Sequence, residues 1–310
     1  MIKQAIMKQS SRRDFLQTSA VLVAAAVTGT SFTIKKHQPL LSFSTLGCPK
    51  WTFPEIVSFA SLHGYKGIEV RGIMGQVDLS KCNEFSSAQN ISATLKLMED
   101  NNLQFVDLGS SATMHFAAGA ERQKNLDEGK RFIDLAGQVK CPYIRVFPNI
   151  FPKDQDKNAT MDLMAKGLLE LGDYAKGSGV TVLTETHGDL VKSEDIEKLM
   201  QMAEHPNTGL VWDTVNMWTV TKEAPADMYK RIKKYIRHTH IKDARLVAGK
   251  IEYTLMGKGA SPIFETIDIL SNAGYKGYYS FEWEKLWHPE LAEPEIALAD
   301  FPVAMKQHFK

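Results

Sequence analysis

Residues 181–187 of the chain read TVLTETH, and three similar stretches follow it: GLVWDTV at 209–215, IRHTHIKD at 236–243 and YYSFEWE at 278–284. Each stretch is rich in β-branched and aromatic residues, which favour strands. Each also carries an ionisable residue near its end, although strands buried on both faces of a parallel sheet are expected to be almost wholly apolar. The pattern indicates a site at the carboxyl edge of a parallel sheet or barrel.

Four earlier stretches have the same character, namely LSFSTLG at 41–47, KGIEVRG at 66–72, LQFVDLG at 103–109 and YIRVFPN at 143–149. Segments with helical periodicity separate the eight stretches, at 54–63, 87–101, 120–138, 161–177, 193–204, 226–234 and 261–273, with a last helix expected over 295–308. Eight βα units without a GxGxxG motif or a P-loop predict a (β/α)8 TIM barrel rather than a nucleotide-binding open sheet.

The N-terminus has the form of a targeting signal. Residues 11–16 read SRRDFL, and an uncharged run from Gln17 to Ile34 follows. This resembles a twin-arginine export signal, and its apolar core is shorter than a membrane span requires. We therefore predict a signal peptide at residues 1–31, a single barrel domain at residues 32–310, transit through the twin-arginine translocase, a periplasmic location and no stable membrane span in the mature protein.

Composition excludes several classes of protein. Among 310 residues, 37 are Lys or Arg and 36 are Asp or Glu, so no positive field favours nucleic acid as a partner. The three cysteines lie far apart and form no CxxC pair, which argues against a disulfide scaffold and against a Cys-rich zinc site. The oligomeric state stays open, and an oligomer is possible.

Strand alternation places four ionisable side chains on the inner face of consecutive strands. Glu185, Asp213, His240 and Glu282 are separated by 28, 27 and 42 residues, close to one per βα unit. Three carboxylates buried together need a cation. With one imidazole they suit a single divalent ion, Mn²⁺ before Co²⁺, Mg²⁺ or Zn²⁺.

The motifs TETHGD, LVWDTVN, HTHIKDA and YYSFEWE, together with STLGCPKWTFPEIVSFASLHGYKGIEVRG at 44–72, resemble the xylose isomerase-like sugar isomerase/epimerase family. The resemblance implies that Glu185, Asp213, His240 and Glu282 are metal ligands and that the two glutamates are also the catalytic acid and base. His187 and Arg245 would touch substrate oxygens. The implied activity is isomerisation or epimerisation of a sugar by proton abstraction next to a carbonyl, through a metal-stabilised enediolate.

The chain departs from that family's pattern at Asn216, three residues after Asp213, where many relatives carry a histidine. An amide can hydrogen-bond a substrate hydroxyl but cannot transfer a proton. The difference makes a lyase or dehydratase acting on an oxidised sugar or cyclitol a plausible alternative, because the same proton abstraction expels a leaving group on the next carbon.

Other candidates surround the predicted site. Trp51 can stack on a sugar ring or merely contact the start of a helix, and Arg71 and Arg145 can bind hydroxyls, a carboxylate or a phosphate. His115 lies in the loop SSATMHFAAG at 110–119, which can act as a lid over bound substrate or leave the histidine exposed.

Two other classes of protein would share the predicted barrel. Endonuclease IV-like phosphodiesterases share the barrel, but they need more strand-end histidines and a basic face for DNA. A non-catalytic carbohydrate-binding barrel is also conceivable, and a variant that keeps the metal but lacks one catalytic glutamate would separate it from an enzyme.

Overall fold

The structure, a computed structural model, describes residues 39–310. The predicted signal peptide lies outside this range. Eight parallel strands close into a barrel in the order β1-β10-β7-β6-β5-β4-β3-β2. Their bounds are β1 Leu40–Ser44, β2 Gly67–Val70, β3 Gln104–Thr113, β4 Tyr143–Phe147, β5 Thr181–Glu185, β6 Thr208–Asp213, β7 Ile236–Ile241 and β10 Tyr278–Phe281. The predicted (β/α)8 fold is confirmed.

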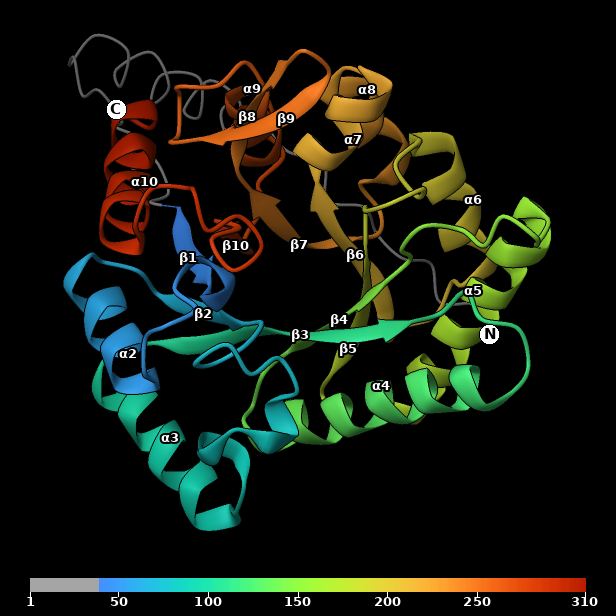
Figure 1. Cartoon of the computed structure of the whole chain (residues 1–310), viewed down its shortest axis with the longest axis horizontal. Coiled ribbons are helices and arrows are strands. Elements are labelled where there is room, and N and C mark those ends of the chain that lie inside the picture. The colour runs from blue at the N-terminus through green and yellow to red at the C-terminus, as the bar shows by residue number, and fades with distance from the viewer. Residues whose placement is uncertain (1–38) are drawn as a thin grey trace, which may run out of the picture. The chain divides into compact units, whose positions relative to one another are not determined.

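Helices cover the outside of the barrel (Figure 1). Those that match predicted segments are α2 Phe53–Leu62, α3 Ala88–Asp100, α4 Ala120–Gln138, α5 Lys157–Tyr174, α6 Ser193–Met202, α8 Pro225–Ile232, α9 Ile263–Asn272 and α10 Pro294–His308. Short 3₁₀ turns lie at Thr45–Gly47, Leu79–Lys81 and Asn83–Phe85. Several helices begin at side-chain caps: Thr52 and Glu55 form a capping box on α2, and Asp156 accepts two backbone N–H bonds on α5.

Strand β3 extends to Thr113, so residues 110–113 of the predicted loop belong to the strand. Two further elements differ from the sequence prediction. The sixth stretch was expected to continue to Val215, but β6 ends at Asp213, whose side chain caps helix α7, Thr214–Thr221. The sequence TVNMWTVT is rich in β-branched residues, so its composition favours a strand although the cap starts a helix.

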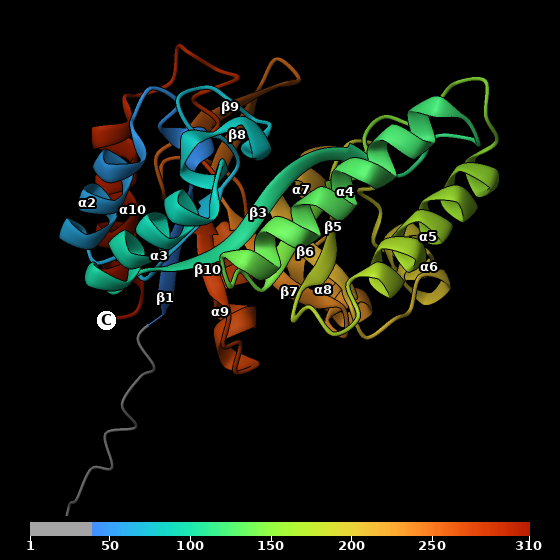
Figure 2. The same cartoon turned by 90° about the horizontal axis from the view of Figure 1, so that it is seen from below.

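The second difference is the antiparallel hairpin formed by β8 Asp243–Val247 and β9 Lys250–Thr254, which follows β7. Its two-residue turn has positive φ at Ala248 (50°) and Gly249 (80°), as a type I′ hairpin turn requires. Figure 2 shows the hairpin at the upper end of the barrel strands. Arg245 was expected to reach substrate from this segment.

The C-terminal helix closes the outer layer through aromatic contacts. Phe281 on β10 stacks on Phe301 of α10, with ring centroids 4.7 Å apart, and Tyr65 donates a hydrogen bond of 2.6 Å to the Leu298 carbonyl. These contacts fix the end of β10, from which Glu282 projects. Within residues 39–310, no helix is both long and apolar enough to cross a membrane.

Candidate metal centre and active site

Four strand ends bring together a carboxylate from β5, one from β6, an imidazole from β7 and a carboxylate directly after β10. One ligand atom each from Glu185, Asp213, His240 and Glu282 lies within 4.8 Å of the others, and all four side chains are buried. The register explains this proximity, since His240 is the lateral partner of Asp213 on one side and of Ser280 on the other. This is the predicted ligand set, gathered at one point.

The donor set fits a divalent ion. Asp213 Oδ1 accepts the Asn216 backbone N–H at 2.8 Å, and its buried Oδ2 lies 2.9 Å from the Lys242 ammonium. The three buried carboxylates and His240 together offer oxygen and nitrogen donors at one point. Carboxylate and imidazole donors suit Mn²⁺, Mg²⁺ and Zn²⁺ alike.

The two glutamates are held in the same manner from opposite sides of His240. Oε1 of Glu185 lies 3.1 Å from His240 Nδ1, and Oε1 of Glu282 lies 3.2 Å from the same nitrogen. The second oxygen of each glutamate meets a buried cation: Arg145 Nε is 3.2 Å from Glu185 Oε2, and Lys242 Nζ is 2.7 Å from Glu282 Oε2. Each carboxylate is thereby fixed in orientation.

Lys242 joins the carboxylates of three segments. Its ammonium lies 2.9 Å from Asp213 Oδ2 and 2.7 Å from both Glu282 and Glu284. Burial alone would lower the pKa of Lys242, but the charges of Asp213, Glu282 and Glu284 raise it well above its usual range. Lys242 is therefore a permanent positive charge inside the cluster.

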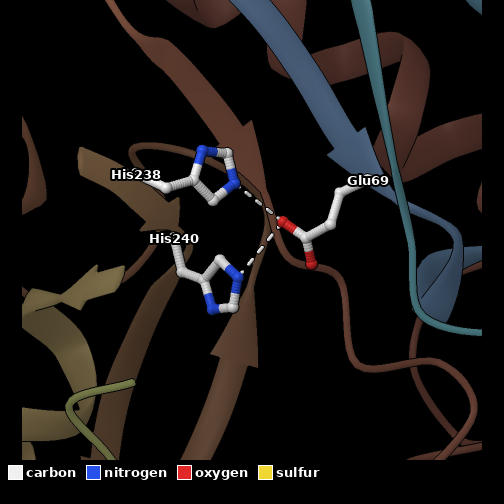
Figure 3. Close-up of side chains that lie close together, drawn as sticks. All are labelled: Glu69, His238 and His240. Carbon is white, nitrogen blue, oxygen red and sulfur yellow. Dashed lines mark hydrogen bonds and ion pairs between the residues drawn. The ribbon is translucent and has the colours of Figure 1, made fainter. Parts of the chain in front are cut away.

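A second group of buried polar side chains, Glu69, His238 and His240, shares His240 with the first group (Figure 3). Glu69 of β2 extends across the interior to β7, where its Oε2 accepts from His238 Nε2 at 2.9 Å and from His240 Nε2 at 3.2 Å. The Ser280 hydroxyl donates to the same oxygen at 3.0 Å. Glu69 thus holds His240 by Nε2 and leaves Nδ1 facing the other three donors, which is the arrangement in which a carboxylate orients a metal-binding imidazole.

Glu69→Gln is expected to weaken binding of Mn²⁺ by roughly 10- to 100-fold, because the imidazole loses the carboxylate that orients it. The matched control is Ser280→Ala, which removes another donor to the same Glu69 oxygen but leaves the His240 contact in place. Competition with a fluorescent chelator measures both dissociation constants. Equal Mn²⁺ affinity in Glu69→Gln and wild type would contradict this role.

Asp107 is a buried acid beside Glu69 in the strand register, and neither of its oxygens has a hydrogen-bond partner in the described chain. Burial, together with the charge of Glu69, raises its pKa to about 8. Between about pH 4, near the pKa of an unfolded aspartate, and this value, the folded protein holds a proton that the unfolded chain releases. Stability contributed by this group therefore falls as pH rises.

Asp107→Asn resembles the protonated acid and is expected to increase the free energy of unfolding, by more at about pH 8 than at about pH 5. Urea unfolding of variant and wild type at both pH values measures the difference. An increase that is the same at both would show that Asp107 does not titrate as described.

The structure also places three predicted substrate-binding residues close to the cluster. Asn216 Nδ2 donates to Glu185 Oε1 at 3.4 Å and to the Thr186 carbonyl at 3.2 Å. Arg145 is buried against Glu185 and covers the Phe147 ring, with 3.7 Å between its guanidinium carbon and the ring centroid. His187 packs 5.0 Å from Phe147, and its buried Nδ1 has no partner among residues 39–310.

The remaining predicted residues make other contacts. Trp51 packs on Phe59 of α2, with ring centroids 4.9 Å apart, and His115 is buried with Nδ1 2.9 Å from the Pro148 carbonyl oxygen. The exposed-loop alternative for His115 is therefore wrong. Arg245 lies on the hairpin and pairs with Glu252, with Nη2 3.0 Å from its Oε2. Substrate contacts by these three residues stay predictions.

Sequence reasoning missed two residues of the site. Glu69 stands in the middle of the apolar strand GIEV, and that charge was the available signal. Lys242 directly follows β7, where a lysine would ordinarily be solvated, but it is buried. Neither contact could be read from local pattern, because both depend on which strands meet across the barrel.

Comparison with known protein families identifies the family of this chain. A sequence model described as a xylose isomerase-like TIM barrel matches residues 57–300. The chain belongs to this family. A twin-arginine translocation signal matches residues 9–29, which confirms the predicted export signal and implies the translocase as a partner during export.

Curated relatives of this xylose isomerase-like barrel carry the name inosose dehydratase. One from Clostridium botulinum is 22% identical over 291 residues, covering 84% of this chain and 89% of the relative. One from Bacillus cereus is 26% identical over 280 residues, covering 80% of this chain and 87% of the relative. The likeness extends through nearly the whole length of both proteins.

Solved structures share the barrel at lower identity. The IOLI protein with a bound zinc atom has a TM-score of 0.70, 18% identity and coverage of 86% of this chain and 95% of its own. A Mycobacterium smegmatis barrel in complex with magnesium has a TM-score of 0.66 and 17% identity, and the match covers 88% of this chain and 97% of that structure. D-psicose 3-epimerase from Clostridium cellulolyticum has a TM-score of 0.69 and 14% identity, covering 86% and 97%. Family and buried cluster together support a metal-dependent enzyme of sugar-type compounds.

Proposed function

We propose that this protein is a metal-dependent lyase that removes water from an oxidised sugar or a keto-cyclitol. The observation that carries the proposal is the pair of glutamates, Glu185 and Glu282, fixed on either side of His240 Nδ1 inside one buried four-donor cluster. The names of the curated relatives favour dehydration over isomerisation.

Glu185, Asp213, His240 and Glu282 would hold one divalent ion, with Mn²⁺ our first candidate. The ion supplies a Lewis acid that polarises a substrate carbonyl. One glutamate takes the proton from the carbon next to that carbonyl. The electron pair of the broken C–H bond forms a C=C bond and expels the hydroxyl on the following carbon, which leaves as water after it receives a proton.

Several neighbouring side chains position the substrate and the glutamates in this proposal. Arg145 and Lys242 hold the outer oxygens of Glu185 and Glu282, so the inner oxygens stay directed at the cluster. Asn216 hydrogen-bonds Glu185 and offers an amide to a substrate hydroxyl without carrying a proton itself. His187, Arg245, Trp51 and His115 are proposed as further substrate contacts.

Isomerisation or epimerisation is the second candidate, because the same proton abstraction starts both reactions and the barrel resembles a D-psicose 3-epimerase. The test is incubation of the Mn²⁺-loaded protein in D₂O with inosose, D-fructose and D-fructuronate, followed by NMR and mass spectrometry. Deuterium exchange with loss of one water supports the lyase. Exchange without loss of water supports the isomerase, and no exchange with any compound contradicts both.

We further propose a periplasmic location for the mature protein, beginning near residue 32. The twin-arginine signal supports export across a membrane. Fractionation of cells expressing the full chain, with the Arg12→Lys/Arg13→Lys variant as control, tests both the compartment and the cleavage site.

A further inference from the structure

Arg71 is a buried cation without a salt bridge. It directly follows β2 and is 5% exposed. Three Lys or Arg side chains are buried in residues 39–310: Arg145 pairs with Glu185, Lys242 pairs with three carboxylates, and Arg71 pairs with none. An unpaired buried charge is costly unless something else compensates for it.

The hydrogen bonds of Arg71 leave one edge of the guanidinium unused. Nη2 donates to the Ser111 hydroxyl at 2.9 Å, whereas Nη1 is buried and has no partner in the described chain. Glu128 also lies beside Ser111, but its Oε1 accepts from the Ser111 backbone N–H at 2.7 Å and makes no salt bridge with Arg71 in the described chain. Glu128 therefore does not satisfy the free edge.

Gly109 of β3 lets the side chains of Arg71 and Arg145 run beside each other. A Cβ atom at Gly109 would lie 2.8 Å from Arg71 Cδ and 3.1 Å from Arg145 Nη2, so both arginines cross the same bare stretch of backbone. Arg145 in turn reaches Glu185 at 3.2 Å. One side chain thus separates Arg71 from a metal ligand.

The two arginines repel each other. Burial, and after it the charge of Arg145, lowers the pKa of Arg71 to about 10, which still leaves the guanidinium charged at neutral pH. An anion at Nη1 would relieve both the burial cost and the repulsion. A planar carboxylate matches a guanidinium edge in shape and charge.

We propose that the substrate carries a carboxylate and that Arg71 binds it beside the metal cluster. The inference rests on the proposed function and narrows its substrate class to keto acids of sugar or cyclitol type. A neutral polyol would bring only hydroxyl groups to Nη1, whereas a carboxylate would give the guanidinium a directly bonded partner of opposite charge.

The test uses three ligands with one carbon skeleton: D-fructose, D-fructuronate, which has a carboxylate at C6, and D-fructose 6-phosphate. Calorimetry on the Mn²⁺-loaded protein measures their dissociation constants for wild type and Arg71→Gln. The control is Arg231→Gln, which removes an exposed arginine paired with Glu197 on the outer helices. Metal content is measured for every variant, so that loss of the ion is not mistaken for loss of the anion site.

We expect wild type and Arg231→Gln to bind D-fructuronate at least about tenfold more tightly than D-fructose, as a charge-assisted hydrogen bond predicts. In Arg71→Gln the preference should disappear while D-fructose affinity and metal content stay unchanged. The proposal would be overturned if wild type bound D-fructuronate and D-fructose equally, or if it did not bind D-fructuronate measurably. It would also be overturned if Arg71→Gln kept the preference for D-fructuronate, or if D-fructose 6-phosphate bound more tightly than D-fructuronate. If the protein dehydrates inosose but does not bind D-fructuronate, the proposed lyase activity stands and only the proposed carboxylate on the substrate is refuted.

Discussion

Asp213→Asn is expected to reduce the metal content of the purified protein from a stoichiometric amount to a trace. The substitution removes one of three anionic donors and leaves the positive charge of Lys242 beside those that remain, with Nζ 2.9 Å from the altered side chain. Asparagine caps helices as well as aspartate does, so α7 keeps the hydrogen bond from the Asn216 N–H. The loss should therefore come from the ligand rather than from unfolding.

Elemental analysis of protein purified without added metal, and again after reconstitution with Mn²⁺, measures this effect. Asp156→Asn is the matched control, because Asp156 caps α5 by the same kind of side-chain bond but belongs to an exposed helix start. It should keep its metal. Stoichiometric metal in Asp213→Asn would remove Asp213 from the ligand set, and no metal in wild type after reconstitution would overturn the metalloenzyme assignment.

Glu282→Gln, reconstituted with Mn²⁺ and compared per bound ion, is expected to lower kcat by on the order of 10³-fold, since an amide cannot accept a proton. Burial would raise the pKa of Glu282, but the charges of His240 and Lys242 hold it well below its usual range, so the carboxylate is ionised at neutral pH. Loss of the proton acceptor should reduce kcat far more than it changes KM.

Deuterium exchange and turnover, each normalised to metal content, measure the loss. Glu290→Gln is the control, because Glu290 lies in the same connection but has a side chain that is 72% exposed. Unchanged turnover in Glu282→Gln would show that Glu282 is not the base. Unchanged ligand binding with no turnover in variant or wild type would instead favour the non-catalytic carbohydrate-binding barrel.

Much of the fold could be predicted from the sequence because parallel barrel strands are short, apolar and evenly spaced. All eight strands and eight of the helices follow from that periodicity. The four clustered donors could be predicted too, since each ends a strand and alternation fixes its face. These are local signals, and closure of the barrel brings the strand ends that carry the four donors close together.

The rest depends on contacts between distant strands. The Glu69 bond to His240 spans 171 residues and crosses the interior, and no local pattern specifies which strands face each other there. The burial of Lys242 likewise follows from three carboxylates that surround it. Helix α7 was not predicted, because the cap formed by Asp213 outweighs the strand preference of the β-branched residues in this segment.

The ammonium of Lys242 also bears on whether the protein must bind its metal ion before it folds and is exported. Three carboxylates at the mouth of the barrel are already paired with it, and Glu185 is paired with Arg145, so their mutual repulsion is offset before any metal arrives. Folding then does not have to wait for the ion, and a twin-arginine passenger travels folded. A cluster neutralised in this way can bind its ion either before or after export, because its fold does not depend on the ion.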